Sequence, residues 1–306
     1  MIGRLHISAS LLLILLVAVA RAQQPEPKPL PAKAPAERLD GPPIVSAKGW
    51  VIADGKSGKV LWGHQEAEAL AIASTTKIMT ATIVLRLASE NAKVLDEKIT
   101  FSEKAAKTIG SSAKLKQGEQ VTVRDLLYGL LLPSGNDAAT AFAEHFGPRL
   151  LAKDGKEDAI ASFVAEMNRQ AKALKMEETK YLDPHGLSAN RSSPRDLATL
   201  AVHALKDKRF AEYVQTRRHQ CGVVGPNDEK RDVVWENTNR LLGIEGYEGI
   251  KTGSTLAAGS CLVGSGRHGN DHLVVVVLGS TSNDSRYVDT RNLFRWAWQQ
   301  REQRKP

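Results

Sequence analysis

The stretch LAIASTTKIMTATIVLRLA, residues 70–88, is a helix-like apolar run whose first turn is polar. Ser74, Thr75, Thr76 and Lys77 stand at its beginning, where a core helix has no obvious use for a lysine. Residues three apart share one face of a helix, with about 5–6 Å between their Cβ atoms. Ser74 and Lys77 are therefore a candidate nucleophile beside a candidate base.

A Ser-x-x-Lys spacing is weak by itself, because both residue types are common. It occurs a second time at Ser111 and Lys114, which follow Gly110 in a polar stretch with no apolar helix after them. We interpret that copy as loop. Ser74 instead heads a helix, where free backbone N–H groups and the positive end of the helix dipole can stabilise an anion.

A second feature is LLPSGNDAATAF, residues 131–142. An apolar helix stops at Pro133, and a new helix is expected to follow, capped by Asn136 or Asp137. Capping alone could explain Ser134 and Asn136, so their chemistry stays open at this point. Another Ser-x-Asn, at residues 188–190, lies in a predicted loop of no special character.

The third feature is YEGIKTGST, residues 247–255, a β-rich run that contains Lys251, Thr252 and Gly253. Glycine inside a strand often marks the close approach of another backbone. The alternative interpretation is a strand with a surface lysine and a bulge.

The N-terminal residues are predicted to be an export signal. Arg4 and His6 precede an apolar run at residues 11–20, and the small-x-small pattern that ends at Ala22 is typical of a signal-peptidase site. The alternative, a retained membrane anchor, needs roughly 20 apolar residues rather than about ten. We therefore expect a signal peptide at 1–22, a proline-rich tether at 23–43 and a single catalytic domain at 44–306.

Composition excludes several functions. The formal charge of +8 over 306 residues is scattered, without a basic stripe interleaved with aromatic residues, so nucleic acid is not an expected partner. The eight histidines show no His-x-His pairing, and neither a metal site nor a cofactor is expected. Cys221 and Cys261 are the two cysteines, and the sequence leaves open whether they form a disulfide or are buried small residues.

Periodicity predicts an α+β fold. GWVIADGKSGKVLWG, residues 49–63, indicates a hairpin, and strands return near the C-terminus. We expect helices at 74–88, 122–132, 157–174, 194–205 and 286–300, and late strands at 247–254, 259–265 and 272–279. This order predicts a single antiparallel sheet built from both chain ends, flanked by helices, with an all-helical insertion. The last helix is expected to pack on the sheet, with a membrane-surface helix as the alternative.

The three motifs, in the order Ser-x-x-Lys, Ser-x-Asn and Lys-Thr-Gly, form the set typical of penicillin-binding proteins and class A β-lactamases. Over residues 44–300 the chain resembles the serine-type D-Ala-D-Ala carboxypeptidases, which are low-molecular-mass penicillin-binding proteins. The words STTKIMTA, LLPSGNDAA, NTNRLLGIEGYEGIKTGST and AAGSCLVGSG resemble that family's own segments. The resemblance implies the β-lactamase/transpeptidase-like fold.

The resemblance also implies roles in catalysis. Ser74 would attack the carbonyl of the penultimate D-alanine, and Lys77 would take the serine proton. That role requires a neutral amine, with a pKa lowered by burial and by a second cation, Lys251. Ser134 would relay a proton to the departing D-alanine.

The same resemblance implies how substrate is held. Lys251 and Thr252 would bind the terminal carboxylate, in a segment that includes Gly253. Asn136 would hydrogen-bond the peptide carbonyl, and the N–H groups of Ser74 and Ser254 would form the oxyanion hole. The implied partners are peptidoglycan peptides ending in acyl-D-Ala-D-Ala, with β-lactams as covalent inhibitors.

Two departures from the family pattern bear on function. The chain stops about fifty residues after Lys251, as in a shorter, soluble branch that includes D,D-endopeptidases. The middle motif is Ser-Gly-Asn rather than Ser-Asp-Asn, and no Glu-x-x-Leu-Asn segment is found, which argues against β-lactam hydrolysis. We expect a D-alanyl-D-alanine carboxypeptidase exported to the periplasm or cell-envelope exterior of a bacterium, without membrane contact once the signal is cleaved. The alternatives are a D,D-endopeptidase, a β-lactamase or a catalytically idle penicillin-binding protein.

Overall fold

The computed structural model describes residues 41–150 and 158–303. The signal peptide expected at 1–22 and the tether up to residue 40 lie outside the described residues. The elements are, in chain order, β1 (Gly49–Asp54), β2 (Val60–His64), β3 (Leu70–Ala71), η1 (Ala73–Thr76), α1 (Lys77–Glu90), η2 (Ala92–Asp96), β4 (Lys98–Thr100), α2 (Glu103–Ala106), β5 (Gln120–Thr122), α3 (Val123–Leu131), α4 (Asn136–Leu150), α5 (Ala159–Ala173), β6 (Arg191–Ser192), α6 (Pro194–Ala204), α7 (Lys208–Gln215), β7 (Arg218–Val224), β8 (Lys230–Glu236), η3 (Arg240–Gly243), β9 (Tyr247–Thr255), β10 (Gly259–His268), β11 (Asp271–Ser280) and α8 (Ser285–Gln303).

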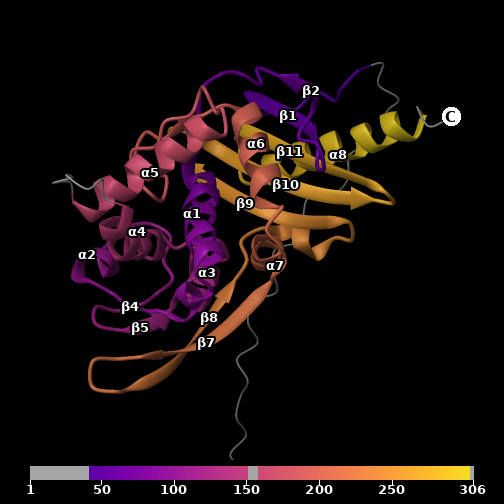
Figure 1. The fold of residues 1–306 in the computed structure, drawn as a ribbon. Coiled ribbons are helices and arrows are strands. Elements are labelled where there is room, and N and C mark those ends of the chain that lie inside the picture. The colour runs from indigo at the N-terminus through magenta and orange to yellow at the C-terminus, as the bar shows by residue number, and fades with distance from the viewer. Residues whose placement is uncertain (1–40, 151–157, 304–306) are drawn as a thin grey trace, which may run out of the picture.

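The main sheet combines strands from both parts of the chain, as predicted. Its order is β2-β1-β11-β10-β9, and all four neighbouring pairs are antiparallel. Gly49 pairs with Leu278 and Asp54 with Leu273, so the whole of the first strand lies along the middle of the last one. In Figure 1 the indigo hairpin lies beside the orange and yellow strands for this reason. β9, which carries the Lys-Thr-Gly segment, is an edge strand of this sheet.

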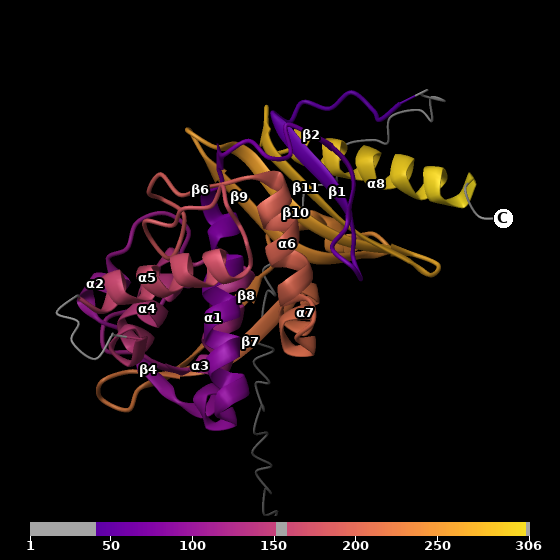
Figure 2. The same ribbon diagram turned by 45° about the horizontal axis from the view of Figure 1, so that its top comes forward.

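Both faces of the main sheet are covered by helices. Because side chains alternate along a strand, Val274 and Val276 belong to one core cluster, whereas Leu273 and Val275 belong to the other. The first cluster includes Leu197 of α6, and the second includes Leu293, Phe294, Trp296 and Trp298 of α8. Figure 2 shows α6 and α8 on either side of the strands. The prediction that the last helix packs on the sheet is confirmed.

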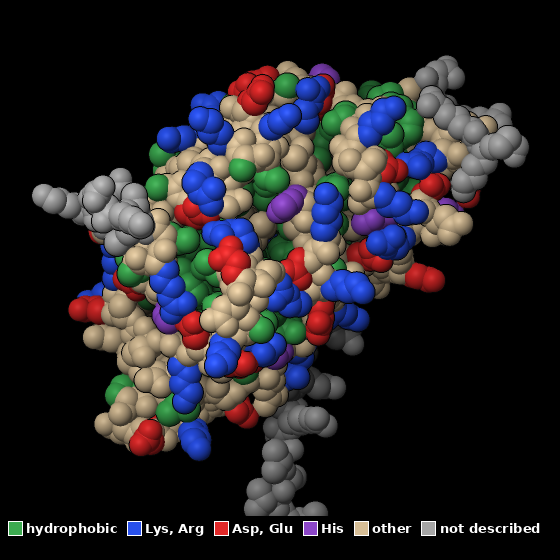
Figure 3. All heavy atoms as spheres, viewed as in Figure 1, with side chains coloured by type: hydrophobic (Ala, Val, Ile, Leu, Met, Phe, Trp, Pro, Cys, Tyr) green, Lys and Arg blue, Asp and Glu red, His purple; other side chains and the backbone are tan. Residues whose placement is uncertain are grey.

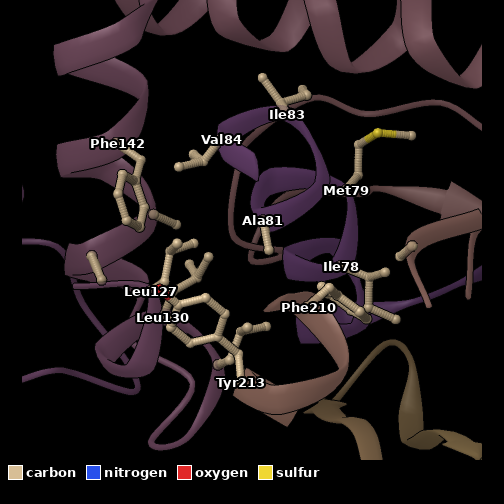
Figure 4. Packing of buried hydrophobic residues seen from close by; sticks show 14 of the residues in the cluster. Ile78, Met79, Ala81, Ile83, Val84, Leu127, Leu130, Phe142, Phe210 and Tyr213 are labelled. Atoms are coloured by element: carbon tan, nitrogen blue, oxygen red, sulfur yellow. The ribbon is translucent and has the colours of Figure 1, made fainter. Parts of the chain in front are cut away.

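The helical region is organised around α1, whose buried side chains point in several directions. Figure 4 shows Val84 facing Phe142 of α4, and Ile78 beside Phe210 of α7. Leu127 and Leu130 of α3 and Tyr213 of α7 fill the space below, and all of these residues are at most 5% exposed. A helix that is apolar on most sides is expected at the centre of a domain. α1 is therefore packed against other elements on most of its sides, beginning with its first residues.

Helix boundaries agree with the capping signals in the sequence. The side chains of Thr122, Asp158 and Ser193 each accept a hydrogen bond from the backbone N–H three residues later, at the starts of α3, α5 and α6. These are N-caps with the residue types expected there. For α5 the cap at Asp158 shifts the start from the predicted residue 157, which lies outside the described residues.

The expectation of one sheet with an all-helical insertion is wrong in one respect. β4, β5, β7 and β8 form a second, four-stranded sheet, and β3 pairs with β6 in a two-stranded one. β4 and β5 have only three residues each, too few to show a period. Half of the residues in β7 and β8 are polar, and half are exposed, so these strands lack the long apolar run that marks a buried strand.

Charged side chains are interspersed on the face drawn in Figure 3, where Lys and Arg lie among Asp and Glu. This matches the scattered charge of the sequence. Within the described ranges, no helix combines the length and the apolar character needed to cross a bilayer.

Candidate active site

Ser74 lies in the short 3-10 helix η1, and the α-helix proper begins at Lys77. The predicted helix start at Ser74 is therefore corrected by one turn. Ala73 has a positive φ of 45°, and both the N–H and the hydroxyl of Thr75 donate to the Ile72 carbonyl, at 3.2 and 2.7 Å. In this tight turn the side chains of residues three apart still lie side by side. Lys77 Nζ is 2.9 Å from Ser74 Oγ.

Lys77 is fully buried, and its ammonium group has three hydrogen-bond acceptors. Nζ donates to Ser74 Oγ at 2.9 Å, to Asn136 Oδ1 at 2.7 Å and to the His185 carbonyl at 2.9 Å. Burial lowers the pKa of Lys77 to about 7, against the opposing effect of the carboxylates of Asp183 and Asp137. A substantial fraction of the amine is then neutral near neutral pH, as a base must be.

Asn136 is the first residue of α4, but its side chain does not cap that helix. Oδ1 accepts from Lys77, and Nδ2 donates to the Ile109 carbonyl at 2.8 Å. The Asp137 carboxylate accepts from the N–H of Ala113 at 2.8 Å and from Ser112 Oγ at 2.7 Å, so it holds a neighbouring loop. The capping interpretation of Asn136 is wrong, and its amide is part of the lysine site.

Ser134 stands in the turn between α3 and α4 with a positive φ of 67°. Its side chain is 5% exposed, and Oγ has no hydrogen-bond partner among the described residues. At Gly135 a Cβ atom would lie 2.8 Å from the Gly129 carbonyl oxygen and 3.0 Å from the Ala113 nitrogen. The glycine in the middle of Ser-Gly-Asn is therefore required by the close packing of this turn on α3.

β9 passes against the turn that carries Ser74. A Cβ atom at Gly253 would lie 2.8 Å from the Ser74 nitrogen and 3.0 Å from the Thr75 nitrogen. The expectation that this glycine marks a close backbone approach is confirmed. The first two motifs meet at Lys77, and the third lies against the backbone of Ser74 and Thr75.

Lys251 is buried, so the surface-lysine interpretation is wrong. Its Nζ donates to the Thr252 carbonyl at 3.0 Å. Burial, and after it the charges of Lys77 and Arg286, hold the pKa of Lys251 well below its usual range. Thr252 Oγ1 lies 2.9 Å from Thr238 Oγ1, and Ser254 Oγ donates to Asn283 Oδ1 at 2.9 Å.

The loop at residues 182–190 contains functional residues that sequence reasoning missed. The Asp183 carboxylate accepts from the N–H groups of His185, Gly186 and Ser188. Burial raises the pKa of Asp183, but hydrogen bonding and charge from His185 and bonds from these N–H groups outweigh it and hold the pKa well below its usual range. Asn190 Nδ2 donates to Thr76 Oγ1 at 3.0 Å and to the Asp183 carbonyl at 3.0 Å.

This network fixes the loop on the nucleophile turn. At Gly186, where φ is +94°, a Cβ atom would lie 2.0 Å from the Ala73 oxygen. The prediction that residues 188–190 form a loop of no special character is wrong. The sequence feature that could have indicated a structured loop is the run DPHGLSAN, residues 183–190. It contains several residue types that form turns or whose side chains hydrogen-bond to nearby backbone.

Arg286, in the first turn of α8, is the second group that the sequence did not reveal. Its Nη1 donates to the Gly253 carbonyl at 3.2 Å and to Ser254 Oγ at 2.9 Å, and its guanidinium lies over the Tyr287 ring at 4.9 Å. The side chain is buried. Arg286 thus adds a cation beside the Lys-Thr-Gly segment.

The remaining candidates lie outside the site's chemistry. Ser111 and Lys114 are in a loop, as predicted, and Lys114 has a positive φ of 61°. The backbone carbonyl of Ser111 accepts from the Asn136 N–H at 2.7 Å. Cys221 and Cys261 are both free thiols, in β7 and β10 respectively.

Comparison with known proteins gives a consistent result. A family model described as D-alanyl-D-alanine carboxypeptidase matches residues 36–282. The D-alanyl-D-alanine carboxypeptidase of Streptomyces sp. strain K15 is 35% identical, over 86% of this chain and 91% of the relative. The carboxypeptidase DacF of Bacillus subtilis is 34% identical over 84% of this chain, which spans 63% of that relative. A D-alanyl-D-alanine endopeptidase of Pseudomonas aeruginosa is 31% identical, over 80% and 75% of the two chains.

Solved structures agree with the sequence relatives. The Streptomyces K15 DD-transpeptidase superposes with a TM-score of 0.78 at 34% identity, covering 85% of this chain and 99% of the other. The carboxypeptidase DacD of Francisella tularensis gives a TM-score of 0.75 at 28% identity, covering 87% and 74%. The α+β transpeptidase-like fold expected from the sequence is confirmed.

Proposed function

The chain belongs to the D-alanyl-D-alanine carboxypeptidase family, and on that premise we propose that Ser74 is its acylated nucleophile. Ser74 Oγ attacks the carbonyl carbon of the penultimate D-alanine in a peptidoglycan stem peptide. The Oγ–C bond forms, the C–N bond to the terminal D-alanine breaks, and water then hydrolyses the acyl-enzyme. The enzyme is thus a serine peptidase that releases one D-alanine per turnover.

The observation that carries this proposal is the buried Lys77–Ser74 pair. Nζ lies 2.9 Å from Oγ, within direct proton-transfer distance. With a pKa of about 7, Lys77 can be neutral before acylation and can hold the serine proton afterwards. The Asn136 and His185 oxygens fix the amine from the opposite side. No metal or other cofactor enters this mechanism.

Ser134 is proposed to relay the proton that Lys77 took from Ser74 to the leaving amine, giving up its own hydroxyl proton and receiving this one in return. Its hydroxyl is buried and has no partner within the described ranges, so it can donate to a substrate without losing a bond inside the protein. The positive φ of 67° is the kind of backbone strain found where a side chain must be presented to a site.

Substrate is proposed to bind along β9, beside the nucleophile turn. Lys251, Thr252 and Arg286 supply positive charge and donors for the terminal carboxylate, since charge-assisted hydrogen bonds are the strong ones. The N–H groups of Ser74 and Ser254 form the oxyanion hole, and Gly253 allows the two backbones to approach. Asn136 binds the peptide carbonyl by exchanging its Nδ2 bond to the Ile109 carbonyl for a substrate oxygen.

A D,D-endopeptidase is the second candidate, because one relative at 31% identity bears that name. Mass spectrometry of muropeptides incubated with purified protein separates the two. Loss of one alanine from pentapeptides supports the carboxypeptidase, whereas conversion of cross-linked dimers to monomers supports the endopeptidase. If neither reaction occurs while penicillin labels Ser74, the result supports the alternative of a catalytically idle penicillin-binding protein.

Labelled penicillin tests the nucleophile itself, because a β-lactam is an acyl donor of similar shape to acyl-D-Ala-D-Ala. We expect a lasting adduct that peptide mapping locates at Ser74 and that Ser74→Ala abolishes together with turnover. An adduct at Ser111, or none on folded protein, would overturn the assignment.

The domain limits and the location are also proposals. Residues 1–22 act as a signal peptide, 23–43 as a tether and 44–306 as the catalytic domain, in a protein exported to the periplasm or cell-envelope exterior. N-terminal sequencing of the mature protein checks this: it should begin at Gln23. A mature chain that still began at Met1 would contradict it.

A further inference from the structure

Three potential metal ligands of different chemistry meet on the second sheet. Asp125 lies in the first turn of α3, and His219 and Cys221 are alternate residues of β7. One ligand atom from each lies within 4.8 Å of the other two. β7 runs beside α3 at this place (Figure 1), and His219 Nε2 is 2.8 Å from Asp125 Oδ1. None of the three has a part in the peptidase chemistry proposed above.

Local structure fixes two of these side chains. The His219 ring stacks on Tyr128, with centroids 3.7 Å apart and an interplanar angle of 14°, and lies 6.2 Å from the ring of Trp235 on its own hairpin. The Asp125 carboxylate accepts from the Thr122 hydroxyl at 2.6 Å through Oδ2, which leaves Oδ1 turned toward the histidine. Cys221 follows His219 on the same face of the strand, because side chains two apart point the same way.

We propose that Asp125, His219 and Cys221 bind a divalent transition-metal ion, with Zn²⁺ as the best match. A carboxylate oxygen, an imidazole nitrogen and a thiolate sulfur are the ligand types that Zn²⁺ takes in proteins. Ligand atoms around a tetrahedral Zn²⁺ lie about 3.3–3.8 Å apart, so small side-chain rotations must widen the 2.8 Å spacing of His219 and Asp125 and set Cys221 Sγ, which lies within 4.8 Å of both, at the same distance. The imidazole proton of His219 moves to Nδ1 so that Nε2 can bind the ion beside Asp125 Oδ1, the thiol proton of Cys221 passes to solvent, and water completes the fourth position.

The charges of the three ligands balance a divalent cation once the ion has displaced the thiol proton of Cys221. Asp125 and the thiolate together carry two negative charges, which match one Zn²⁺. The alternative is a plain Asp–His hydrogen bond with a thiol beside it, and the two accounts differ in whether Cys221 ligates an ion. The sequence contains no His-x-His pair, but His-x-Cys on a strand likewise places two ligands on one face.

A metal here would join α3 to β7, two elements that are far apart in the sequence. The test uses the full-length protein, reduced with a phosphine, stripped with a chelator and titrated with Co²⁺, which reports sulfur ligation by a thiolate-to-cobalt charge-transfer band. We expect this band in the wild type and its loss when Zn²⁺ is added. A wild-type protein that shows no such band overturns the proposal.

The chain offers a matched control, because Cys261 is its other cysteine. Cys261 is buried, and its Sγ contacts the carbonyls of Ala71 and Ala258 rather than a histidine. We expect Cys221→Ser to abolish the band and Cys261→Ser to retain it. The reverse pattern, or a band that persists in Cys221→Ser, overturns the proposal.

His219→Gln and Asp125→Asn test the other two ligands. Each should weaken Co²⁺ binding at least tenfold, whereas a single-ligand cysteine site would be indifferent to both and would overturn the proposal. Penicillin labelling of Ser74 serves as the folding control, since none of these residues lies in the active site. A gain in melting temperature on Zn²⁺ addition, present in the wild type and absent in Cys221→Ser, provides an independent measurement.

Discussion

Lys77 and Lys251 are both buried lysines, yet their surroundings are opposite. Lys77 Nζ has three oxygen acceptors, and the carboxylates of Asp183 and Asp137 favour its charged form. Lys251 Nζ donates to one backbone carbonyl, and its charged neighbours Lys77 and Arg286 disfavour its own charge. Among the described residues, carboxylates favour the charge on Lys77, whereas the charged groups that act on Lys251 are cations.

Because their surroundings differ, two residues of the same type can have different chemical roles. A buried lysine with acceptors and a moderately lowered pKa can exchange a proton with its neighbour and so act as a base. A buried lysine among cations gains most when an anion arrives, because the anion relieves both desolvation and repulsion. The two lysines should therefore respond differently to substitution.

The largest effect is expected from Lys77→Ala. Removing a general base costs about 10²–10⁴-fold, so acylation of Ser74 by labelled penicillin should slow by that factor for every acyl donor tested. The measurement is the second-order labelling rate. If the rate were unchanged in folded protein, Lys77 would not be the base, and the comparison with Lys251 would fail.

Lys251→Ala should lose less, and selectively. A hydrogen bond to a charged group contributes about 1.5–3 kcal/mol, so cleavage of peptides with a free C-terminal carboxylate should fall roughly 10–100-fold in kcat/KM. Peptides capped as C-terminal amides should be poor substrates of the wild type and change little further. Equal cleavage of capped and free peptides by the wild type would contradict the anchoring role and favour the endopeptidase.

The third effect is a shift in pH dependence. Because the pKa of Lys77 is about 7, the wild-type acylation rate should rise with pH below about 7 and level off above it. Asp183 favours the ammonium, so Asp183→Asn should lower the pKa of Lys77 and move this rise to lower pH. Labelling rates across the pH range measure the shift.

Asp207→Asn is the control for that experiment, since Asp207 caps α7 and pairs with Arg209. It should leave the pH of half-maximal labelling unchanged. If Asp183→Asn moved the rise to higher pH instead, the carboxylate would not be supporting the charged amine, and the account of Lys77 would need revision.

The smallest effect is expected from Thr238→Val. Thr238 Oγ1 is the partner of Thr252 Oγ1 at 2.9 Å, and a neutral hydrogen bond contributes about 0.5–1.5 kcal/mol. Losing it lets the Thr252 hydroxyl rotate, so KM for a free-carboxylate peptide should rise by a few-fold with kcat nearly unchanged. A large fall in kcat would place Thr238 closer to the reaction than the comparison allows.

The amino-acid sequence was sufficient for the features that depend on local spacing. The caps at Thr122 and Ser193 and the pairing of Ser74 with Lys77 follow from contacts between residues three apart. The hairpin at 49–63 joins two strands separated by only five residues. The three motifs, taken together, also indicated the family, because their order is more specific than any one of them. The sequence correctly predicted that Gly253 marks the close approach of another backbone. It did not predict that this backbone is the turn that carries Ser74.

The other features of the site could be known only from the fold, because they depend on contacts between residues far apart in the chain. The carbonyl of His185 is 108 residues from Lys77, and Arg286 is 33 residues from Gly253, so no periodicity links them. The burial of Lys251 and the depressed pKa of Lys77 likewise depend on which elements cover them. The sequence specifies the type of each side chain. The charge state of a titratable side chain depends on the oxygens, cations and apolar groups that folding places around it.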